Sequence, residues 1–594
     1  MLYPCGAIDF RNLNTLWASI IVETLYRCGI ITAVICPGSR STPLTIAFAN
    51  HPQIAAIPIL DERSAAFFAL GKAKKTGIPT VLVCTSGTAG ANFYPAVIEA
   101  KESCVPLIIL TADRPAELRH CHAGQTIDQL KLYGNFPNWQ CEVALPEANM
   151  GILRYLRQNT IQAWKQSLFP VPGVVHLNLP FRKPLAPVPQ PEVAQLQAEF
   201  ASQDFFDAVT SNVPSNYCRI EPPISSWQGK TGVIVAGLAQ PKDPEAYVKA
   251  IALLSNLLSF PVLGEALSPI RNYAENYADL NHCLISTYDS ILRQNDLARE
   301  LIPDIVIQLG ELPTSKQLRQ WLTDIDVERW VVDPRQDNFD PLHGKTIHLH
   351  SSIEDLANSL EPSSKQSDRS QYCQRWWELE NQTRKNLDSA FKSIDTLIEG
   401  KAAWLIAQSL PSKTPIFIAN SMSVRNAEYF WQPNNSRAIP YFNRGANGID
   451  GTLATALGMA DGDRGILLTG DLALLHDTNG FLIAPKFKGH LTIVVINNNG
   501  GGIFEMLPVA DLYSEFETYF ATPQSVNLAK LCLAYGVEHQ TITNWQQLEK
   551  LLKDLPYKGI RVLELNCDRQ ADAAWLKANL ANFSLVSETK IVGL

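Results

Sequence analysis

The sequence predicts an α/β fold of three domains, each a doubly wound, mostly parallel sheet with helices on both faces. Two observations predict it. Short apolar runs, typical of buried strands, alternate with amphipathic segments of helical periodicity along the 594 residues. Proline-rich or polar stretches interrupt this alternation twice, so the chain divides into three blocks of similar size.

The first block is expected to form a domain over residues 1–190. Amphipathic segments such as 64–77 and 91–103 lie between its apolar runs and predict helices. Four prolines within 182–195 exclude helix and sheet interior, so this stretch is expected to be a stiff linker. The expected strands are 31–36, 80–86, 106–113 and 173–180.

The second and third blocks are expected to form domains over residues 200–365 and 395–594. Between these two domains, residues 361–371 are mostly small and polar, which predicts a second linker. A helix is expected after it, near 376–394. The expected strands of the second block are 231–239, 260–266, 304–313 and 329–334. Those of the third are 414–421, 465–471, 491–498 and 560–566.

Composition excludes several classes of protein. The net charge is -8 without a basic block, so nucleic-acid binding has no electrostatic support. No apolar run reaches the ~18 residues of a membrane span, and the N-terminus lacks the pattern of a signal peptide. The twelve cysteines are scattered without a CxxC pair, as expected for free thiols in a reducing compartment. We therefore expect a cytoplasmic protein without a membrane span.

Polar residues follow two apolar strands of the third block. Asp471 ends one strand, and Asn498 ends the next, 27 residues later, within the run NNNGGGIF. In open parallel sheets, ligands bind at this edge, and one carboxylate, one amide oxygen and a backbone carbonyl such as that of Gly500 suit Mg²⁺. Taken alone, the segment with Asp471 could be an aspartate turn, and the run NNNGGGIF could be an unrelated glycine-rich hairpin. Together, at this spacing, they favour a metal and phosphate site.

This pair of segments resembles the diphosphate motif of thiamine diphosphate enzymes, a Gly-Asp-Gly followed one strand later by paired asparagines. Leu472 stands where that family usually has its second glycine. The resemblance implies thiamine diphosphate as cofactor and Mg²⁺ (or Mn²⁺) as metal. It also implies that the metal ligands are Asp471, Asn498 and Gly500, and that the further cofactor contacts of this domain are Leu472, Gly501 and Ile503.

The first block offers the carboxyl group that such a cofactor needs. Asp61 and Glu62 precede an apolar helix, where acidic residues often only face the helix dipole. In thiamine diphosphate enzymes, however, a glutamate at this position contacts the aminopyrimidine, and Glu62 matches it. The segment 84–100 resembles the loop on the pyrimidine side, so Ser86, Gly87 and Thr88 are expected near the ring. Capping of the next helix explains these three residues equally well.

Further segments resemble one branch of the superfamily, 2-succinyl-5-enolpyruvyl-6-hydroxy-3-cyclohexene-1-carboxylate (SEPHCHC) synthase of menaquinone and phylloquinone biosynthesis. These enzymes decarboxylate 2-oxoglutarate and add the succinyl unit to isochorismate. The segments lie mainly in the first and third blocks: CPGSRSTPL (36–44), LDERSAAFFALG (60–71), ADRPAEL (112–118), GQTIDQ (124–129), NSMSVRNAEYF (420–430) and NRGANGIDG (443–451).

The two substrates are anionic, so arginines are expected to bind them. Arg40 lies in a loop before Pro43, which suits the first turn of a helix whose N–H groups attract an anion. The resemblance implies that Ser39, Arg40, Gln125 and Lys316 contact isochorismate. It implies that Ser421, Arg425 and Arg444 contact the part derived from 2-oxoglutarate, that Ile449 wedges beneath the cofactor, and that Phe504 lines the pocket. The expected catalytic residues are Glu62, Arg40, Gln125, Arg425 and Arg444.

One departure from the family pattern concerns the residue after Lys316. It is Gln317, where some members have a second cation, so one carboxylate contact is weaker or Arg271 or Arg319 replaces it. The resemblance also implies a homodimer or homotetramer with the active site between subunits. Three alternatives stay open: another thiamine diphosphate-dependent decarboxylase or carboligase, a non-catalytic homologue, and a nucleotide-binding protein, although the chain lacks a Walker lysine loop.

Overall fold

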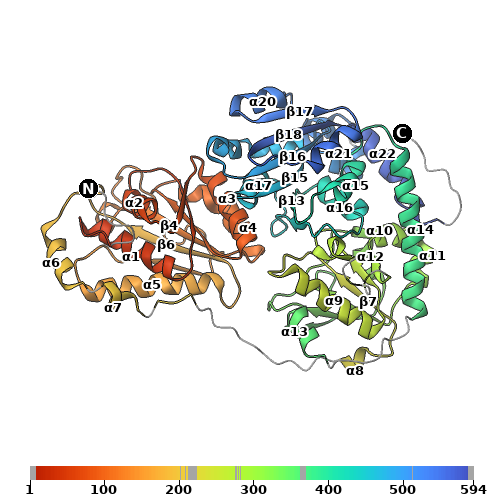
Figure 1. The fold of residues 1–594 in the computed structure, drawn as a ribbon, viewed down its shortest axis with the longest axis horizontal. Helices are drawn as coiled ribbons and strands as arrows, with labels where there is room; N and C mark the ends of the chain where they lie inside the picture. Colours follow the sequence, from red (N-terminus) through yellow and green to blue (C-terminus); the bar gives the residue numbers. More distant parts are fainter. Residues whose placement is uncertain are drawn as a thin grey trace. The chain divides into compact units, whose positions relative to one another are not determined.

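The computed structural model describes residues 8–200, 202–207, 209–211, 224–274, 277, 280, 282–360, 370–511 and 513–585. These residues contain three six-stranded sheets in which every paired strand is parallel, with helices between the strands (Figure 1). The predicted fold class is therefore confirmed. The bounds of the three domains stay a prediction, and most of the expected second linker, 361–369, lies outside the described residues. The chain divides into two compact units, which we describe separately.

The first unit holds the first sheet, with strand order β2-β1-β3-β4-β6-β5. Its strands are β1 (Thr32–Ile35), β2 (Ala55–Pro58), β3 (Thr80–Cys84), β4 (Leu107–Asp113), β5 (Trp139–Glu142) and β6 (Val174–Pro180). Its helices are α1 (Leu13–Arg27), α2 (Thr42–Asn50), α3 (Glu62–Thr76), α4 (Tyr94–Glu102), α5 (Met150–Leu168), α6 (Pro191–Glu199) and α7 (Ser202–Phe206). The proline-rich stretch before α6 has neither helix nor strand, and Asn12 and Asn14 bind its backbone carbonyl groups.

Segments 443–461 and 476–486 also belong to the first unit. They contain α17 (Thr452–Ala460), which packs closely on α3. A Cβ on Gly71 would lie 2.0 Å from the Thr455 carbonyl oxygen, and one on Gly458 would lie 2.0 Å from that of Phe68. The two helices can approach this closely because glycine occupies both crossing positions.

The second unit holds the other two sheets. The central one has strand order β12-β11-β10-β7-β8-β9, and the last has order β14-β13-β15-β16-β18-β17. The central strands are β7 (Gly232–Ala236), β8 (Val262–Gly264), β9 (Leu284–Ile285), β10 (Ile305–Leu309), β11 (Glu328–Val332) and β12 (Lys345–Leu349). The last sheet contains β13 (Pro415–Ile418), β14 (Ile439–Tyr441), β15 (Arg464–Gly470), β16 (His490–Asn497), β17 (Glu538–Ile542) and β18 (Gly559–Asn566).

Helices connect these strands, and the 23-residue α14 packs against α10 and the segment after α22 (Figure 1). The helices that accompany the central strands are α8 (Ile224–Trp227), which precedes β7, then α9 (Pro244–Leu258), α10 (Tyr288–Leu292), α11 (Asn295–Glu300) and α12 (Lys316–Asp324), and finally α13 (Ile353–Asn358), which follows β12. The later ones are α14 (Gln371–Ser393), α15 (Glu399–Ser409), α16 (Met422–Phe430), α18 (Asp471–His476), α19 (Tyr513–Phe516), α20 (Leu528–Tyr535), α21 (Trp545–Lys553) and α22 (Arg569–Asn579).

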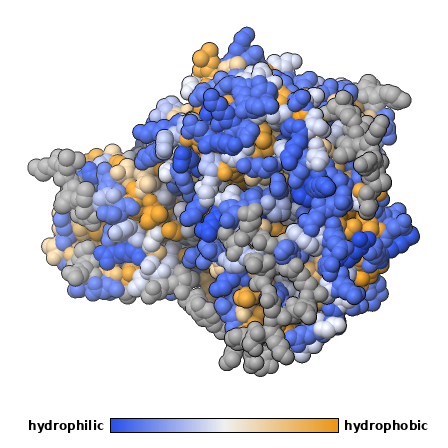
Figure 2. Space-filling model, turned by 45° about the vertical axis from the view of Figure 1, so that its right-hand side comes forward, coloured by the Kyte–Doolittle hydropathy of each residue, from blue (hydrophilic) through white to orange (hydrophobic). Residues whose placement is uncertain are grey.

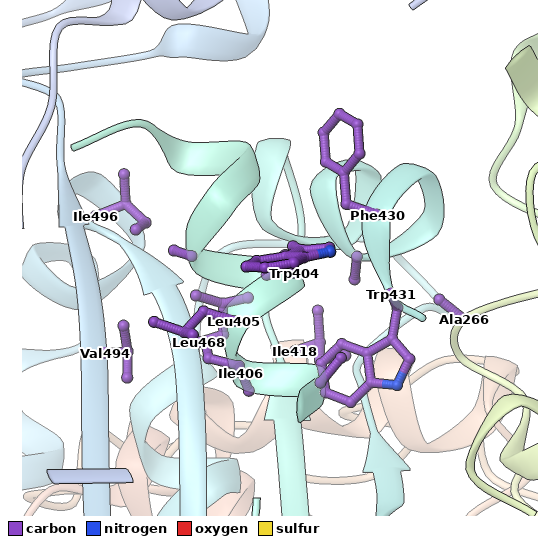
Figure 3. Close-up of a cluster of buried hydrophobic side chains, with 14 of the residues drawn as sticks. Ala266, Trp404, Leu405, Ile406, Ile418, Phe430, Trp431, Leu468, Val494 and Ile496 are labelled. Carbon is purple, nitrogen blue, oxygen red and sulfur yellow. The ribbon is translucent and has the colours of Figure 1, made fainter. Parts of the chain in front are cut away.

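A continuous apolar core fixes α15 against the last sheet. Leu405 and Ile406 of α15 are buried with Leu468 of β15 and with Val494 and Ile496 of β16, which project toward the helix (Figure 3). Because this core is packed, the residues at the start of α15 have fixed positions beside the ends of β15 and β16.

The described surface is mixed in polarity. On the face drawn in Figure 2, hydrophilic residues predominate, and hydrophobic residues lie in small groups between them. Among the described residues, no helix is both long and apolar enough to cross a bilayer.

Candidate active site

Asp471 is the first residue of α18, directly after β15. Its side chain is buried, and Oδ2 accepts a hydrogen bond from the backbone N–H of Gly500 at 2.9 Å. Burial raises the pKa of Asp471 to about 6, although the N–H groups of Leu472 and Gly500 lower it. The Gly500 N–H bonds to Oδ2, and Oδ1 is not part of that bond.

Asn498 follows β16, the neighbour of β15 in the sheet. The register pairs Gly470 with Ile496, so Asp471 and Asn498 lie at the same strand ends. The amide nitrogen Nδ2 of Asn498 donates to Oε1 of Glu399 at 2.5 Å. Its oxygen Oδ1 is buried and has no hydrogen-bond partner among the described residues. A buried polar atom without a partner requires an explanation, and a metal ion would supply one.

The three glycines after Asn499 leave room that other residues would fill. Gly500 has φ 137°, and a Cβ there would meet the Ala521 carbonyl oxygen at 2.4 Å. A Cβ on Gly501 would meet the Phe520 carbonyl oxygen at 2.7 Å. The glycine run thus forms a close backbone turn beside one carboxylate and one unpaired amide oxygen. These residues fit a magnesium ion with a diphosphate. No cluster of three or more His, Cys, Asp or Glu side chains forms a rival metal site within the described ranges.

Leu472, Ile503 and Phe504 are half-buried beside this turn. The Phe504 ring packs edge-on against Phe520, with ring centroids 5.7 Å apart. The candidate site of the second unit therefore contains apolar side chains as well as candidate oxygen ligands.

In the first unit, Asp61 and Glu62 have different surroundings. Asp61 caps α3 by accepting from the Ser64 N–H at 3.0 Å, and it also accepts from Asn479 Nδ2 at 2.7 Å. Glu62 is half-buried and bonds to no other side chain among the described residues. Burial raises the pKa of Glu62, and the charge of Asp61 raises it further. Asp61 is thus structural, whereas the Glu62 carboxyl group is available to a ligand.

The loop after β3 lies against Gln125. The Gln125 Nε2 donates to the Ser86 carbonyl oxygen at 2.9 Å, and the Ser86 hydroxyl donates to the Gln125 carbonyl oxygen at 3.1 Å. The Gly87 N–H donates to Gln129 Oε1 at 3.0 Å. Ser86 and Gly87 are buried, whereas Thr88 is exposed. The structure therefore places Ser86, Gly87 and Gln125 together.

Arg40 is buried beside the same loop. Its backbone N–H donates to Thr85 Oγ1 at 3.2 Å, and its Nη1 donates to the Phe181 carbonyl oxygen at 2.7 Å. Its Nε is buried without a hydrogen-bond partner in the described part of the chain. Burial lowers the pKa of Arg40 and the charge of Arg114 lowers it further, whereas the charge of Asp113 raises it. Two close arginines favour an anion here. The neighbouring Ser39 is exposed.

A second arginine pair lies in the second unit. Arg425 Nη1 donates to the carbonyl oxygen of Ser421 at 2.6 Å. Ser421 has φ 66° and ψ -127°, a conformation that costs energy for a residue with a side chain. Burial lowers the pKa of Arg425 and the charge of Arg319 lowers it further, whereas Tyr429 raises it. Lys316 is exposed at the start of the helix that carries Arg319.

The structure decides between the two candidate replacements for the second cation. Arg271 is fully buried, its Nε donates to the Gly264 carbonyl oxygen, and its Nη2 forms an ion pair with Glu428 at 3.2 Å. The guanidinium group of Arg271 is therefore bound by other protein groups, and the expectation that Arg271 binds a substrate carboxylate is wrong. Gln317 Nε2 donates to the Leu292 carbonyl oxygen at 3.0 Å. Arg319 therefore stays the candidate replacement, and the alternative of one weaker carboxylate contact stays open.

Arg444 and Ile449 belong to the first unit and are both half-buried. The residues after Arg444 are fixed by Glu99 of α4, which accepts from the N–H groups of Gly445 at 3.1 Å and Ala446 at 2.7 Å. This carboxylate holds the loop that carries Arg444.

Three models of thiamine pyrophosphate (thiamine diphosphate) enzyme domains match the chain. The N-terminal TPP-binding domain matches residues 17–132, the middle domain matches 201–418, and the C-terminal TPP-binding domain matches 421–565. The three matches include the segments that carry Glu62, Lys316 and Asp471.

Relatives match over nearly their whole length. A SEPHCHC synthase of Gloeothece citriformis is 64% identical over 97% of this chain and 100% of the relative. The chain belongs to the SEPHCHC synthase family. A second SEPHCHC synthase, of Rippkaea orientalis, is 58% identical over 97% of this chain and 98% of its own. The crystal structure of benzoylformate decarboxylase from Polynucleobacter necessarius has a TM-score of 0.64 at 14% identity, covering 93% and 98% of the two chains. That likeness shows the fold alone.

In this SEPHCHC synthase family member, sequence reasoning missed the residues that support the site. Arg114 follows β4 directly, and its position at a strand end in ADRPAEL was a usable signal. Glu99, Glu399 and Asn426 gave no such signal, because their partners are distant in sequence.

Proposed function

We propose that this protein decarboxylates 2-oxoglutarate and adds the succinyl unit to isochorismate, with thiamine diphosphate and Mg²⁺ (or Mn²⁺), in menaquinone or phylloquinone biosynthesis. The observation that carries the proposal is the match with SEPHCHC synthases at 64% identity over 97% of the chain. The arrangement of Asp471, Asn498 and the glycine turn supports the metal and the diphosphate. The reaction is a transfer with a carbon–carbon bond formed and CO₂ released.

Thiamine diphosphate, when bound, supplies the electron sink that a 2-oxoacid needs to lose CO₂. Asp471 Oδ1, Asn498 Oδ1 and the Gly500 carbonyl oxygen would hold the metal beside the diphosphate. Leu472, Gly501 and Ile503 would border the cofactor, as would Ser86, Gly87 and Thr88 on the pyrimidine side, with Ile449 beneath it.

Glu62 would hold a proton at the ring nitrogen of the aminopyrimidine. Burial raises the pKa of Glu62, which favours the protonated carboxyl group in a partly dry site. No other side chain among the described residues occupies that group, so it can serve the cofactor.

Cationic residues would bind the substrate carboxylates. Arg40 has a buried Nε without a partner among the described residues, and Gln125 lies beside the same loop. We assign Ser39, Arg40, Gln125 and Lys316 to isochorismate. We assign Ser421, Arg425 and Arg444 to the part derived from 2-oxoglutarate, and Phe504 to the pocket wall. Apolar residues at the site would keep water from competing with the acceptor.

The proposal includes a cytoplasmic homodimer or homotetramer with the active site between subunits. Mixing two inactive variants tests the shared site. If Glu62 of one subunit acts with Asp471 of another, a mixture of Glu62→Gln and Asp471→Ala chains regains about a quarter of parent activity after random dimer exchange. No gain after subunit exchange, with mixed dimers seen by native mass spectrometry, would exclude this arrangement.

Mass spectrometry of the reaction tests the activity itself. The mixture contains purified protein, thiamine diphosphate, Mg²⁺, 2-oxoglutarate and freshly made isochorismate, with a control lacking the cofactor. A cofactor-dependent succinyl adduct of isochorismate is expected. Decarboxylation without an adduct would favour another decarboxylase or carboligase. Bound cofactor without either reaction would favour a non-catalytic homologue.

A further inference from the structure

A buried carboxylate lies behind the proposed metal ligand Asn498. Glu399 is the first residue of α15 and is 5% exposed. Its Oε1 accepts from Asn498 Nδ2 at 2.5 Å, and its Oε2 accepts from Asn426 Nδ2 at 3.2 Å. The backbone N–H of Glu399 donates to Asp572 Oδ1 at 3.2 Å. Both carboxyl oxygens of Glu399 therefore accept from amide groups.

The contact with Glu399 determines which end of the Asn498 amide faces away from it. An asparagine side chain has one acceptor atom and one donor nitrogen, and only the oxygen binds a cation. Turning the amide by half a turn would place Oδ1 of Asn498 against Oε1 of Glu399, so two acceptors would meet. In the observed orientation, Oδ1 is the buried atom without a partner among the described residues.

The backbone of Gly502 lies close to this pair of side chains. A Cβ on Gly502 would lie 2.7 Å from Asn498 Nδ2 and 3.4 Å from Glu399 Oε1. The glycine therefore lets the turn close over the pair of side chains. A group enclosed in this way has few alternative rotamers.

We infer that Glu399 is a positioning residue: it holds the Asn498 amide so that Oδ1, and not Nδ2, faces the metal. This inference rests on the proposed function, because it presupposes a divalent cation at Asp471 and Asn498. Partners of metal ligands typically change metal affinity by ~10–100-fold when they are removed. The effect is on the geometry of a ligand and does not require Glu399 to touch the metal.

Two variants separate this role from a simple attraction between charges. Glu399→Asp keeps the charge but shortens the side chain, so the carboxylate no longer reaches Asn498 Nδ2. Glu399→Gln loses the charge but keeps an oxygen of the same reach, and Asn426 can turn its amide to accept from the new nitrogen, since Asn426 Oδ1 has no partner among the described residues. If Glu399 acts by positioning, only Glu399→Asp should lose metal affinity. If it acts by attracting the cation, Glu399→Gln should lose metal affinity.

Mn²⁺ affinity is measured by electron paramagnetic resonance, with thiamine diphosphate and without substrates. We expect Glu399→Asp to bind Mn²⁺ ~10–100-fold more weakly and Glu399→Gln to stay close to the parent. Glu380→Asp is the matched control, because Glu380 is also buried in the second unit but accepts from Ser286 and Thr287. Thermal unfolding checks that each variant is folded.

Each other outcome has a definite meaning. Parent-like affinity of Glu399→Asp, or a loss confined to Glu399→Gln, would overturn the positioning role. An equal loss in Glu380→Asp would also overturn it, since the effect would then be a general loss of structure. If the parent protein itself binds no Mn²⁺, the metal site of the proposed function is wrong, and the inference falls with it.

Discussion

The carboxylate of Asp471 accepts a hydrogen bond from the backbone N–H of Gly500 at 2.9 Å. This bond joins the end of β15 to the turn after β16, and it uses one of the two oxygens of Asp471. In the proposed site, the other oxygen would bind the metal. The contact thus ties the carboxylate ligand to the backbone that would hold the diphosphate.

Replacing Asp471 with asparagine should abolish metal-dependent cofactor binding. The variant removes the only charged ligand in the proposed set, so we expect the affinity for thiamine diphosphate in Mg²⁺ to fall more than ~100-fold. Isothermal titration calorimetry measures it. Asp388→Asn is the control, because Asp388 bonds to Trp404 in the same unit, away from the site. Unchanged cofactor affinity in Asp471→Asn would remove Asp471 from the site.

Replacing Glu62 with glutamine should lower kcat and leave cofactor affinity nearly unchanged. Loss of a group that handles a proton costs typically ~10²–10⁴-fold in rate. Asp61→Asn is a close control, because Asp61 caps α3 and an asparagine can still cap it. Near-normal turnover in Glu62→Gln, or an equal loss in Asp61→Asn, would contradict the assignment.

The sequence predicted the inner strands of all three sheets and missed the edges. In each sheet the four inner strands coincide with expected apolar runs, whereas the strands at the two edges were not expected. The edge strands β2, β12 and β17 consist mostly of partly buried and exposed residues, and β9 has only two residues. Inner strands are covered on both faces and therefore read as continuous apolar runs.

The candidate site, like the sheets, could be predicted from the sequence only in part. Residues at strand ends, such as Asp471 and Asn498, carry a sequence signal because parallel strands end at one edge. Their supporting partners carry none. Glu399 lies 99 residues from Asn498, and Glu99 lies 347 residues from Ala446. Such contacts depend on the packing of the helices, which the pattern of a single segment does not contain.

Replacing Gly500 with alanine should disturb the turn after Asn499. The residue has φ 137°, and the added Cβ would lie 2.4 Å from the Ala521 carbonyl oxygen, so the turn must move. We expect Gly500→Ala to weaken Mn²⁺ binding and to lower Tm, because a strained backbone costs ~1–3 kcal/mol. Gly536→Ala is the control: its φ is 69° and nothing lies within 4 Å of its Cβ position. If Gly500→Ala binds Mn²⁺ as tightly as Gly536→Ala does, the close turn at Gly500 is not needed for metal binding.

Stability should depend on pH through Asp477. Its Oδ2 accepts from the N–H of Ala454 in the first turn of α17, and burial raises the pKa of Asp477 to about 7 from 3.8. Between these two values the folded protein holds a proton that the unfolded chain has lost. The contribution of Asp477 to stability therefore falls as pH rises through this window and is constant above it.

The variant Asp477→Asn lacks this ionisation. Each unit of pKa shift corresponds to about 1.4 kcal/mol, so the variant gains up to about 4 kcal/mol relative to the parent at pH 8 and almost nothing at pH 4. Calorimetric Tm across that range measures the difference. A constant difference between the two proteins at every pH would mean that Asp477 does not titrate in this window.

Arg319 should be the cation that replaces the family's second positive charge. Its Nε and Nη2 donate to the carbonyl oxygens of Pro313 and Leu312 at 2.8 and 3.1 Å, and its charge lowers the pKa of Arg425. Among the described residues, neither arginine has an ion pair with a carboxylate. Two neighbouring cations without a counter-ion favour a substrate carboxylate, whose charged hydrogen bonds are worth ~1.5–3 kcal/mol each.

Arg319→Gln should therefore raise KM for 2-oxoglutarate by ~10-fold or more, with a smaller effect on KM for isochorismate. Gln320→Ala is the control on the same helix, since Gln320 bonds to Asp324 and is exposed. Steady-state kinetics with each substrate varied in turn measures both constants. If KM for 2-oxoglutarate does not change, Arg319 serves only the loop at Leu312 and Pro313, and this protein binds that carboxylate with one cation fewer. If KM for isochorismate rises instead, Arg319 acts with Lys316 on the acceptor, and the assignment of the two substrates must be exchanged at this position.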